Sequence, residues 1–331
     1  MQKEQFHPIT HLLLVLVFVA SMSACNHEKA SLPDTLPENE GLPHATINRK
    51  LFHVETFGDP ANPTVIVIHG GPGWDYTYML PLANLSDRYF VVFYDQSGCG
   101  LSPRYDANQL TVANALEDLH QIVLRYHHKR RVNLIGHGYG AMLASAYVGQ
   151  HPERVAYTVL VEPVALGSTP SRQTTPAASN LVFTNLVQGA SHLSPEDHLK
   201  ADGELMERLL NPKQFPAIAA RNNTLRTDQF VTRPGAMASE VITQQLYDPQ
   251  QGFLIDFTLG NQRFKNTILL LFSAQNPYFT PEKKQALQQH LQRSLVKTIP
   301  ETGYFIFSDN PSATVTTIRE YFNDTGMIHT F

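Results

Sequence analysis

Hydrophobic runs and polar turns alternate along most of the chain from about residue 62 onward. Short β-branched runs that end in glycine or polar residues are typical of buried strands, and apolar residues spaced three and four apart are typical of helices. The predicted strands are Thr64–His69, Tyr89–Tyr94, Val132–Ile135, Val155–Val161, Thr267–Phe272 and Ser294–Ile299. The predicted helices are Leu110–Tyr126, a helix that ends at Val148, Pro281–Leu291 and Pro311–Phe322. This order predicts an α/β fold with a mostly parallel central sheet flanked by helices.

Residues 163–262 interrupt the alternation, because they contain no clear strand and are rich in Ser, Thr, Gln, Asn and Pro. Ser194, Pro195 and Asp197 are typical of a helix start, with a capping serine, a proline in the first turn and an acid three residues later. A loop of about 100 residues would be far longer than usual. We therefore predict a mainly helical cap over 163–262, inserted in a core made of 47–162 and 263–331.

The N-terminus contains an apolar run over residues 12–20. This run is too short for a membrane-spanning helix, which needs about 20 residues. Lys3 precedes the run and small residues follow it, which is the layout of a secretory signal peptide over residues 1–24. A short membrane anchor is the alternative interpretation.

Met22-Ser23-Ala24-Cys25 resembles a bacterial lipobox, in which the cysteine is lipidated and becomes the first mature residue. That resemblance implies a cell-envelope protein held to the membrane through Cys25, and a plain secreted protein is the alternative. In a Gram-negative cell, Asn26 after the cysteine would imply that the protein is sorted to the outer membrane. Residues 25–46 are polar and proline-containing, which predicts a weakly ordered tether.

Composition narrows the possible function classes. Hydrophobic residues make up 42% of the 331 residues, enough for a large core, so a disordered chain is excluded. The 25 basic and 29 acidic residues give a net charge of -4, which argues against a nucleic-acid partner. The chain has only two cysteines and no histidine-rich or acid-rich spacing typical of a metal site. We therefore expect no metal or other cofactor. If Cys25 is lipidated, Cys99 is expected to be a small buried hydrophobe.

Three glycine-rich turns each follow a predicted strand: His69-Gly70-Gly71-Pro72-Gly73, Asp95-Gln96-Ser97-Gly98-Cys99-Gly100-Leu101-Ser102 and Gly136-His137-Gly138-Tyr139-Gly140-Ala141. Their order and spacing resemble the α/β-hydrolase family, in particular its proline-iminopeptidase-like members. Those proteins have HGGPG, DQRGxGxS and GxSxG at these places. The resemblance covers roughly Ile47 to Phe322, and Ser97 stands where the family usually has arginine.

The resemblance implies a role for each matched position. The backbone N–H groups of Gly71 and Tyr139 correspond to the oxyanion hole. Gly138 occupies the nucleophile position, Asn276 the acid position and Tyr304 the general-base position of the catalytic triad. If the turn keeps the strained shape of a nucleophile elbow, Gly138 is expected to have a positive φ.

These residue types do not support the triad chemistry. A glycine cannot form an acyl-enzyme. A phenol with a pKa near 10 is a poor base at neutral pH, and asparagine cannot stabilise an imidazolium by charge.

A rewired catalytic set is the alternative. Glu162 comes directly after the predicted strand Val155–Val161. Haloalkane dehalogenases, which are members of the resembled family, have their catalytic acid at the end of this strand. A contact of Glu162 with the pocket entrance or the cap is the alternative explanation. A base would have to be one of the histidines near the turns or in the cap, which are His69, His137, His192 and His198. Motif packing or solvation would explain those histidines equally, and turn packing would explain Ser97, Ser102 and Cys99.

The sequence therefore favours a catalytically inactive, lipid-anchored protein with an α/β-hydrolase fold. It would bind a small carbonyl- or carboxylate-bearing ligand, or a protein partner, without turnover. The first alternative is an esterase or aminopeptidase relative with a rewired catalytic set. The second is a structural envelope protein whose pocket has closed.

Overall fold

The computed structural model of the protein describes residues 32–168, 187–210, 231–303 and 305–323. The expected signal peptide, Cys25 and Tyr304 lie outside the described residues. All elements below belong to one compact unit, Pro33–Phe331.

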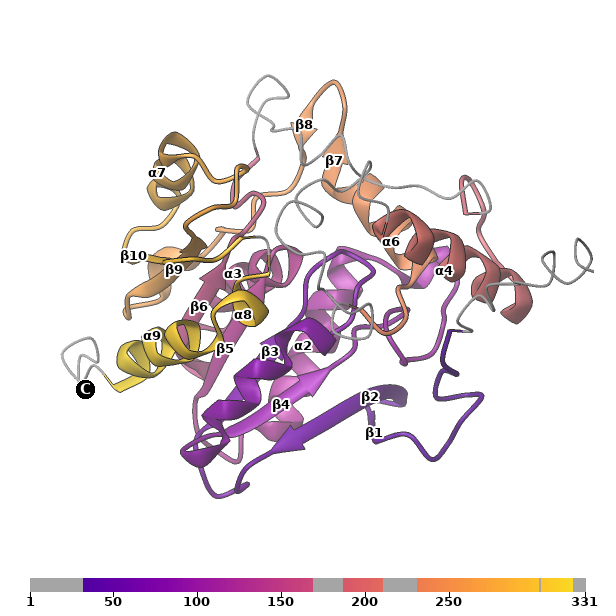
Figure 1. The fold of residues 1–331 in the computed structure, drawn as a ribbon, viewed down its shortest axis with the longest axis horizontal. Helices are drawn as coiled ribbons and strands as arrows, with labels where there is room; N and C mark the ends of the chain where they lie inside the picture. The colour runs from indigo at the N-terminus through magenta and orange to yellow at the C-terminus, as the bar shows by residue number, and fades with distance from the viewer. Residues whose placement is uncertain (1–31, 169–186, 211–230, 304, 324–331) are drawn as a thin grey trace, which may run out of the picture. The chain divides into compact units, whose positions relative to one another are not determined.

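An eight-stranded sheet forms the core, with strand order β1-β2-β4-β3-β5-β6-β9-β10 (Figure 1). The strands are β1 (His44–Ile47), β2 (Lys50–Phe57), β3 (Thr64–Ile68), β4 (Phe90–Tyr94), β5 (Val132–His137), β6 (Val155–Val161), β9 (Ile268–Ser273) and β10 (Ser294–Ile299). The last six run parallel to one another, and β2 pairs antiparallel with both β1 and β4. This confirms the predicted mostly parallel α/β sheet.

Every residue of β3, β4, β5 and β9 is buried. Because successive side chains point to opposite faces of a sheet, this burial shows that both faces are covered at these strands. It also explains why these strands were recognisable in the sequence as continuous apolar runs. The sequence does not predict β1 or β2, because polar residues interrupt their pattern, such as His44 in β1 and Glu55 in β2. Pairing defines these strands, since β2 pairs with β4 and β1 pairs with β2.

The helices of the core are α2 (Val112–Tyr126), α3 (Tyr139–Gln150), α7 (Pro281–Gln289), α8 (Ile306–Asp309) and α9 (Pro311–Asn323), with 3₁₀ helices η1 (Thr77–Asp87), η2 (Ala107–Gln109) and η3 (Pro152–Arg154). Three of them, α2, α7 and α9, begin within two residues of their predicted starts, and α3 ends two residues after its predicted end. The short helix α8 and the 3₁₀ helices were not among the predicted elements. Side-chain oxygens of Thr111 and Thr280 cap α2 and α7 at their N-termini. Each cap satisfies a backbone N–H that has no partner inside the helix.

The described part of 163–262 contains two helices that pack together, α4 (Pro195–Leu209) and α6 (Ala236–Leu246) (Figure 1). Ser194 caps α4 as predicted, since its side chain accepts a hydrogen bond from the Asp197 N–H at 3.1 Å. A short hairpin of β7 (Tyr247–Asp248) and β8 (Gly252–Phe253) follows α6, and the 3₁₀ helix η6 (Asn261–Arg263) comes after it. The hairpin was not predicted, because two-residue strands leave no periodic pattern. No helix among the described residues combines the length and hydrophobicity needed to cross a bilayer.

The segment from Pro33 to Ile47 is part of the folded unit, which differs from the expectation of a weakly ordered tether up to residue 46. Leu36 is fully buried and its N–H donates to the Leu101 carbonyl oxygen at 2.8 Å. The Arg233 guanidinium donates to the Pro33 carbonyl oxygen at 2.8 Å and to the Glu38 carboxylate at 3.1 Å. These partners are distant in the chain, so local composition could not indicate that the segment is held.

Buried charges connect α4 to the loop before α6 and to the loop after β4. The Asp202 carboxylate, fully buried on α4, pairs with Arg104 at 2.9 Å and with Arg233 at 3.1 Å. Its second oxygen accepts the Ala236 N–H at 2.9 Å. Asp75, which follows the HGGPG loop, accepts the Arg233 N–H at 3.0 Å. Because unpaired buried charges are costly, the side chains of Asp202, Arg104 and Arg233 hold the described part of the cap against the core. Asp75 adds the hydrogen bond that it accepts from the backbone of Arg233.

Backbone contact between α3 and the sheet requires glycine at two positions. A Cβ at Gly140 would lie 2.1 Å from the Ile68 carbonyl oxygen, and a Cβ at Gly136 would lie 2.3 Å from the Gly140 carbonyl oxygen. The end of β5 and the first turn of α3 therefore pack directly against β3.

We expect Gly140→Ala to lower the free energy of unfolding by more than about 2 kcal/mol, because its methyl group would overlap a rigid backbone oxygen. Gly203→Ala is the matched control, since no described atom outside the backbone of α4 lies within 4 Å of its Cβ position. It should raise stability by about 0.5–1 kcal/mol through the better helix propensity of alanine. Urea denaturation of the two variants measures both changes, and equal shifts would contradict the close approach of α3 to β3.

Candidate functional site

Gly138 forms the sharp turn between β5 and α3, at the carboxyl edge of the sheet. Its φ is 54° and its ψ is -115°, so the predicted positive φ is confirmed. The Gly138 N–H donates to the Val161 carbonyl oxygen at 2.9 Å, which ties the turn to the end of β6. A residue with a side chain would be strained in this conformation, at a cost of about 1–3 kcal/mol. The backbone therefore has the conformation expected of a nucleophile elbow, and its central residue has no side chain.

The described residues leave room for a Cβ atom at Gly138. Among the described residues, only the Gly70 Cα comes within 4 Å of the position that a Cβ at Gly138 would take, at 3.9 Å. The conformational strain, and not a steric clash at Cβ, is thus the main local obstacle to a side chain here.

The HGGPG loop lies directly against the elbow. A Cβ at Gly70 would lie 2.9 Å from the His137 carbonyl oxygen, so the two turns touch through their backbones. The Gly70 N–H donates to the Tyr78 hydroxyl at 2.8 Å, and that hydroxyl also contacts His137 Nδ1 at 2.9 Å. Tyr78 thus bridges both turns.

The two predicted backbone donors differ in their surroundings. Gly71 has a φ of 115°, a region that favours glycine. Tyr139 is the first residue of α3, so its N–H has no partner inside the helix. Its side chain is 1% exposed, and burial raises the pKa of its phenol well above the ordinary value, so the ring is a core residue. Only the backbone of Tyr139 is suited to contact a ligand.

Glu162 and Asn276 meet in one buried cluster beyond the ends of β6 and β9. Glu162 Oε2 accepts a hydrogen bond from Asn276 Nδ2 at 2.9 Å, and Glu162 Oε1 accepts one from the Ser273 N–H at 2.9 Å and another from the Ser273 hydroxyl. The exposed fractions of Glu162 and Asn276 are 2% and 4%. Glu162 also has a positive φ of 47°, which is uncommon for a residue other than glycine. The sequence indicates Glu162 and Asn276 separately, and it does not indicate Ser273, because a serine at a strand end is not distinctive.

Burial raises the pKa of Glu162 to about 7. Hydrogen bonds from Ser273 and Asn276 and the positive charge of Lys284 act in the opposite direction, and desolvation is the largest effect. A carboxyl group with this pKa can hold or release a proton near neutral pH, which is the range that a general acid or base needs.

The predicted histidines do not join Glu162 in a triad-like chain through the hydrogen bonds described. His69 Nε2 accepts the Gln96 N–H at 3.0 Å, while His137 Nδ1 contacts Tyr78. Burial lowers the pKa of His137 to about 3, so its ring is neutral and weakly basic at neutral pH. In the cap, His192 pairs with Asp106 at an exposed position, and burial lowers the pKa of His198.

The polar residues of the second glycine-rich turn have structural roles. The Ser97 hydroxyl donates to the Asp118 carboxylate and the Ser102 hydroxyl donates to the Asp95 carbonyl oxygen, both at 2.7 Å. Cys99 is 1% exposed, and burial raises the pKa of its thiol to about 12. A buried thiol with that pKa is not an activated nucleophile. Within the ranges that the structure describes, no group of three or more His, Cys, Asp and Glu side chains is arranged to hold a metal ion.

Comparison with known proteins identifies the family. The family model of the alpha/beta hydrolase fold matches residues 63–311. The chain is 23% identical over 295 residues to a cis-3-alkyl-4-alkyloxetan-2-one decarboxylase of Shewanella oneidensis, covering 85% of this chain and 87% of that protein. It is 24% identical over 275 residues to a proline iminopeptidase of Lactobacillus helveticus, covering 78% and 89%. A proline iminopeptidase of Saccharolobus solfataricus is 40% identical over 101 residues, which is 30% of this chain and 31% of that protein.

Solved structures agree on the fold. A membrane phospholipase A, described as a bacterial virulence factor, superposes with a TM-score of 0.59 at 19% identity, covering 97% of this chain and 99% of that one. The proline iminopeptidase of Mycobacterium smegmatis gives a TM-score of 0.53 at 19% identity, covering 84% and 97%. With the eight-stranded sheet and the glycine turn after β5, these matches show that the chain belongs to the α/β-hydrolase fold family.

Proposed function

We propose that this protein is a catalytically inactive, lipid-anchored member of the α/β-hydrolase fold family that binds a small carbonyl- or carboxylate-bearing ligand without turnover. The observation that carries the proposal is Gly138. The elbow backbone and the room for a Cβ atom at its centre are retained, and the atom that would attack a substrate is missing.

The surroundings of Glu162 support inactivity. In a working triad, the acid orients and charge-stabilises an imidazole. The described partners of Glu162 are instead the amide of Asn276 and the N–H and hydroxyl of Ser273. These groups satisfy the carboxyl group within a buried hydrogen-bond network, so it behaves as a structural element that joins β6 to β9.

Backbone donors support ligand binding at the elbow. The N–H groups of Tyr139 and Gly71 are the groups that the resemblance assigns to an oxyanion hole, and they do not depend on any side chain. Asn276 is not part of this ligand site, because its amide nitrogen donates to Glu162 and its amide oxygen accepts the Tyr278 N–H at 3.1 Å. A ligand with one carbonyl or carboxylate oxygen would suit the two backbone donors. A protein partner that inserts a chain end would present the same chemistry.

An enzyme with a rewired catalytic set is the second candidate, and the pKa of Glu162 favours it. A carboxyl group with a pKa of about 7, at a strand end where some family members place their acid, could serve as the acid of such a set. Because two of the relatives named above are proline iminopeptidases, hydrolysis of aminoacyl compounds, with simple esters as a further substrate class, is the activity to assay.

A serine-directed fluorophosphonate probe is expected not to label the protein, and ester hydrolysis is expected to be absent. Gly138→Ser alone should recover little activity, because triad members act as a unit. Asn276→Asp would place a second carboxyl group against Glu162, so the restoring variant combines Gly138→Ser, Asn276→Asp and Tyr304→His with Glu162→Gln. The control combines Gly138→Ala with the other three substitutions and therefore has no nucleophile. Hydrolysis by the unmodified protein that is lost in Glu162→Gln would favour the rewired enzyme.

A thermal-shift screen of amino acids, short peptides and acyl compounds is expected to find a stabilising ligand. At 100 times its dissociation constant, the ligand adds about 2.7 kcal/mol of stability. Gly138→Leu should abolish the shift by filling the space above the elbow. Gly189→Leu is the matched control, since Gly189 also has a positive φ, of 74°, and no described atom lies within 4 Å of its Cβ position. A shift that persists in Gly138→Leu would place the ligand elsewhere, and no shift with any compound would argue against a small ligand.

Cys25→Ala is expected to move the protein from the membrane fraction to the soluble fraction or to block its processing, because the apolar run that ends at Ala24-Cys25 resembles a lipobox. One acyl chain binds membranes only marginally, whereas several hold a protein stably. Cys99→Ala is the control, since Cys99 is buried and should leave the distribution unchanged. A native mature chain whose intact mass includes no lipid would contradict the anchor.

A further inference from the structure

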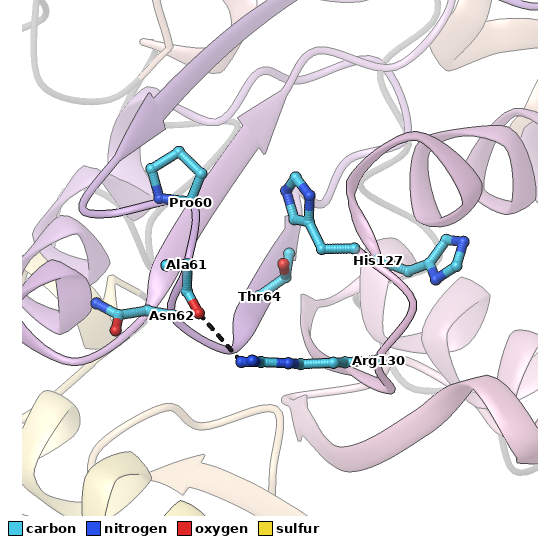
Figure 2. Close-up of a pocket in the computed structure, with 7 residues that line it drawn as sticks. Pro60, Ala61, Asn62, Thr64, His127 and Arg130 are labelled. Atoms are coloured by element: carbon cyan, nitrogen blue, oxygen red, sulfur yellow. Dashed lines mark hydrogen bonds between the residues drawn. The ribbon is translucent and has the colours of Figure 1, made fainter.

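A pocket lies at the amino ends of the central strands, at the opposite edge of the sheet from the elbow. β3 and β5 are parallel neighbours, with Val65 paired to Asn133, so the loops that lead into them meet at their amino ends. These loops enclose a pocket of about 270 Å³ (Figure 2). The pocket is lined by Pro60, Ala61, Asn62, Thr64, His127, His128 and Arg130.

The segment 125–131, which contributes His127, His128 and Arg130 to the pocket lining, is rich in positive charge. Its seven residues are RYHHKRR, without an acidic residue, in a chain whose net charge is -4. The four cations Arg125, Lys129, Arg130 and Arg131 are exposed, and none of them forms an ion pair within the described part of the chain. The nearby acidic side chain is Asp59, which accepts the Ala61 N–H at 2.8 Å. The local positive charge thus favours the binding of an anion.

Two side chains on the pocket wall present hydrogen-bond donors. Figure 2 shows Arg130 reaching toward the Ala61 carbonyl oxygen, to which its Nη1 donates at 3.0 Å. The remaining N–H groups of the guanidinium are not used by any described hydrogen bond, and their planar arrangement matches a phosphate group. The Lys129 N–H donates to His127 Nδ1 at 3.0 Å, so the neutral His127 ring carries its proton on Nε2 and donates there.

The turn that forms this wall is unusual. His128 and Lys129 have φ values of 43° and 61°, a backbone conformation that residues other than glycine adopt at an energetic cost. The turn follows the C-terminus of α2, whose partial negative charge of about half a unit opposes an anion. Four full positive charges in 125–131 outweigh that partial charge. The sequence thus keeps a strained turn and an excess of cations at the same place.

We propose that this pocket binds a phosphate group, carried either by a small soluble phosphomonoester or by the headgroup of an anionic phospholipid. Several cations and a planar guanidinium suit a phosphate better than a singly charged carboxylate. The pocket is slightly smaller than the range of about 300–1,000 Å³ typical of drug-sized ligands, so the bound part of the ligand is small.

Titration calorimetry at low ionic strength tests the site with inorganic phosphate and glycerol 3-phosphate as the probes. We expect saturable binding by the full mature protein, weakened about tenfold or more by Arg130→Gln and also weakened by Lys129→Gln. Arg293→Gln is the matched control, because Arg293 is likewise exposed and its Nη1 donates to the Lys265 carbonyl oxygen at 2.8 Å. This substitution also removes one positive charge, but at a position that does not line the pocket, so it should leave the affinity for phosphate unchanged. Thermal midpoints of the variants verify that they are folded.

A vesicle arm distinguishes the two sources of phosphate. The mature chain, residues 25–331 with Cys25→Ala, is sedimented with phosphatidylcholine vesicles, with and without phosphatidylglycerol. Binding to the anionic vesicles that Arg130→Gln weakens, without binding of the soluble probes, assigns the site to a lipid headgroup. Binding of the soluble probes alone assigns it to a phosphomonoester. Absence of binding in both arms, or binding that Arg130→Gln and Arg293→Gln weaken equally, would overturn the proposal.

Discussion

The close approach of α3 to the central sheet is the constraint on which the candidate site depends. Glycine at positions 136 and 140 lets the backbones of β3, β5 and α3 touch, where a single methyl group would overlap a carbonyl oxygen. This contact forces the chain through the sharp turn at Gly138 and brings the HGGPG loop against it. The shape of the elbow therefore follows from backbone packing, and it is kept whether or not position 138 has a side chain to do chemistry. That separation of shape from chemistry is the physical basis for expecting a binding protein on this fold.

Buried charges hold the described part of the cap against the core. Asp202 between Arg104 and Arg233 connects α4 and the segment before α6 to the loop after β4, and Asp75 accepts a hydrogen bond from the Arg233 backbone. Removing Asp202 or one of its two arginine partners leaves an uncompensated charge in the interior, so displacing α4 from the core has a large cost. Arg233 also holds Pro33 and Glu38, so the described N-terminal segment and the cap are stabilised by the same guanidinium.

The two edges of the sheet thus offer different chemistry. At the carboxyl edge the groups proposed to contact a ligand are backbone amides near Gly138, and Glu162 is bound in a network with Ser273 and Asn276. At the amino edge the proposed site is a small pocket lined by Arg130, with further exposed cations in 125–131. The first would suit one carbonyl or carboxylate oxygen, and the second would suit a phosphate. Because buried strands separate them, the two proposals can be tested by separate variants.

The sequence by itself determined the fold class, most strands and helices, and the positions of Gly138 and Asn276, because buried strands, capping residues and glycine turns each leave a local pattern. It could not reveal β1 and β2, the attachment of residues 33–46 or the short hairpin β7–β8, because pairing with distant residues defines them. It indicated Glu162 and Asn276 but not that they contact each other, since hydrogen bonding across 114 residues leaves no local signal. Likewise, only the tertiary structure brought residues 60–64 beside 127–130 to form a pocket, because sheet order, and not sequence distance, decides which loops meet.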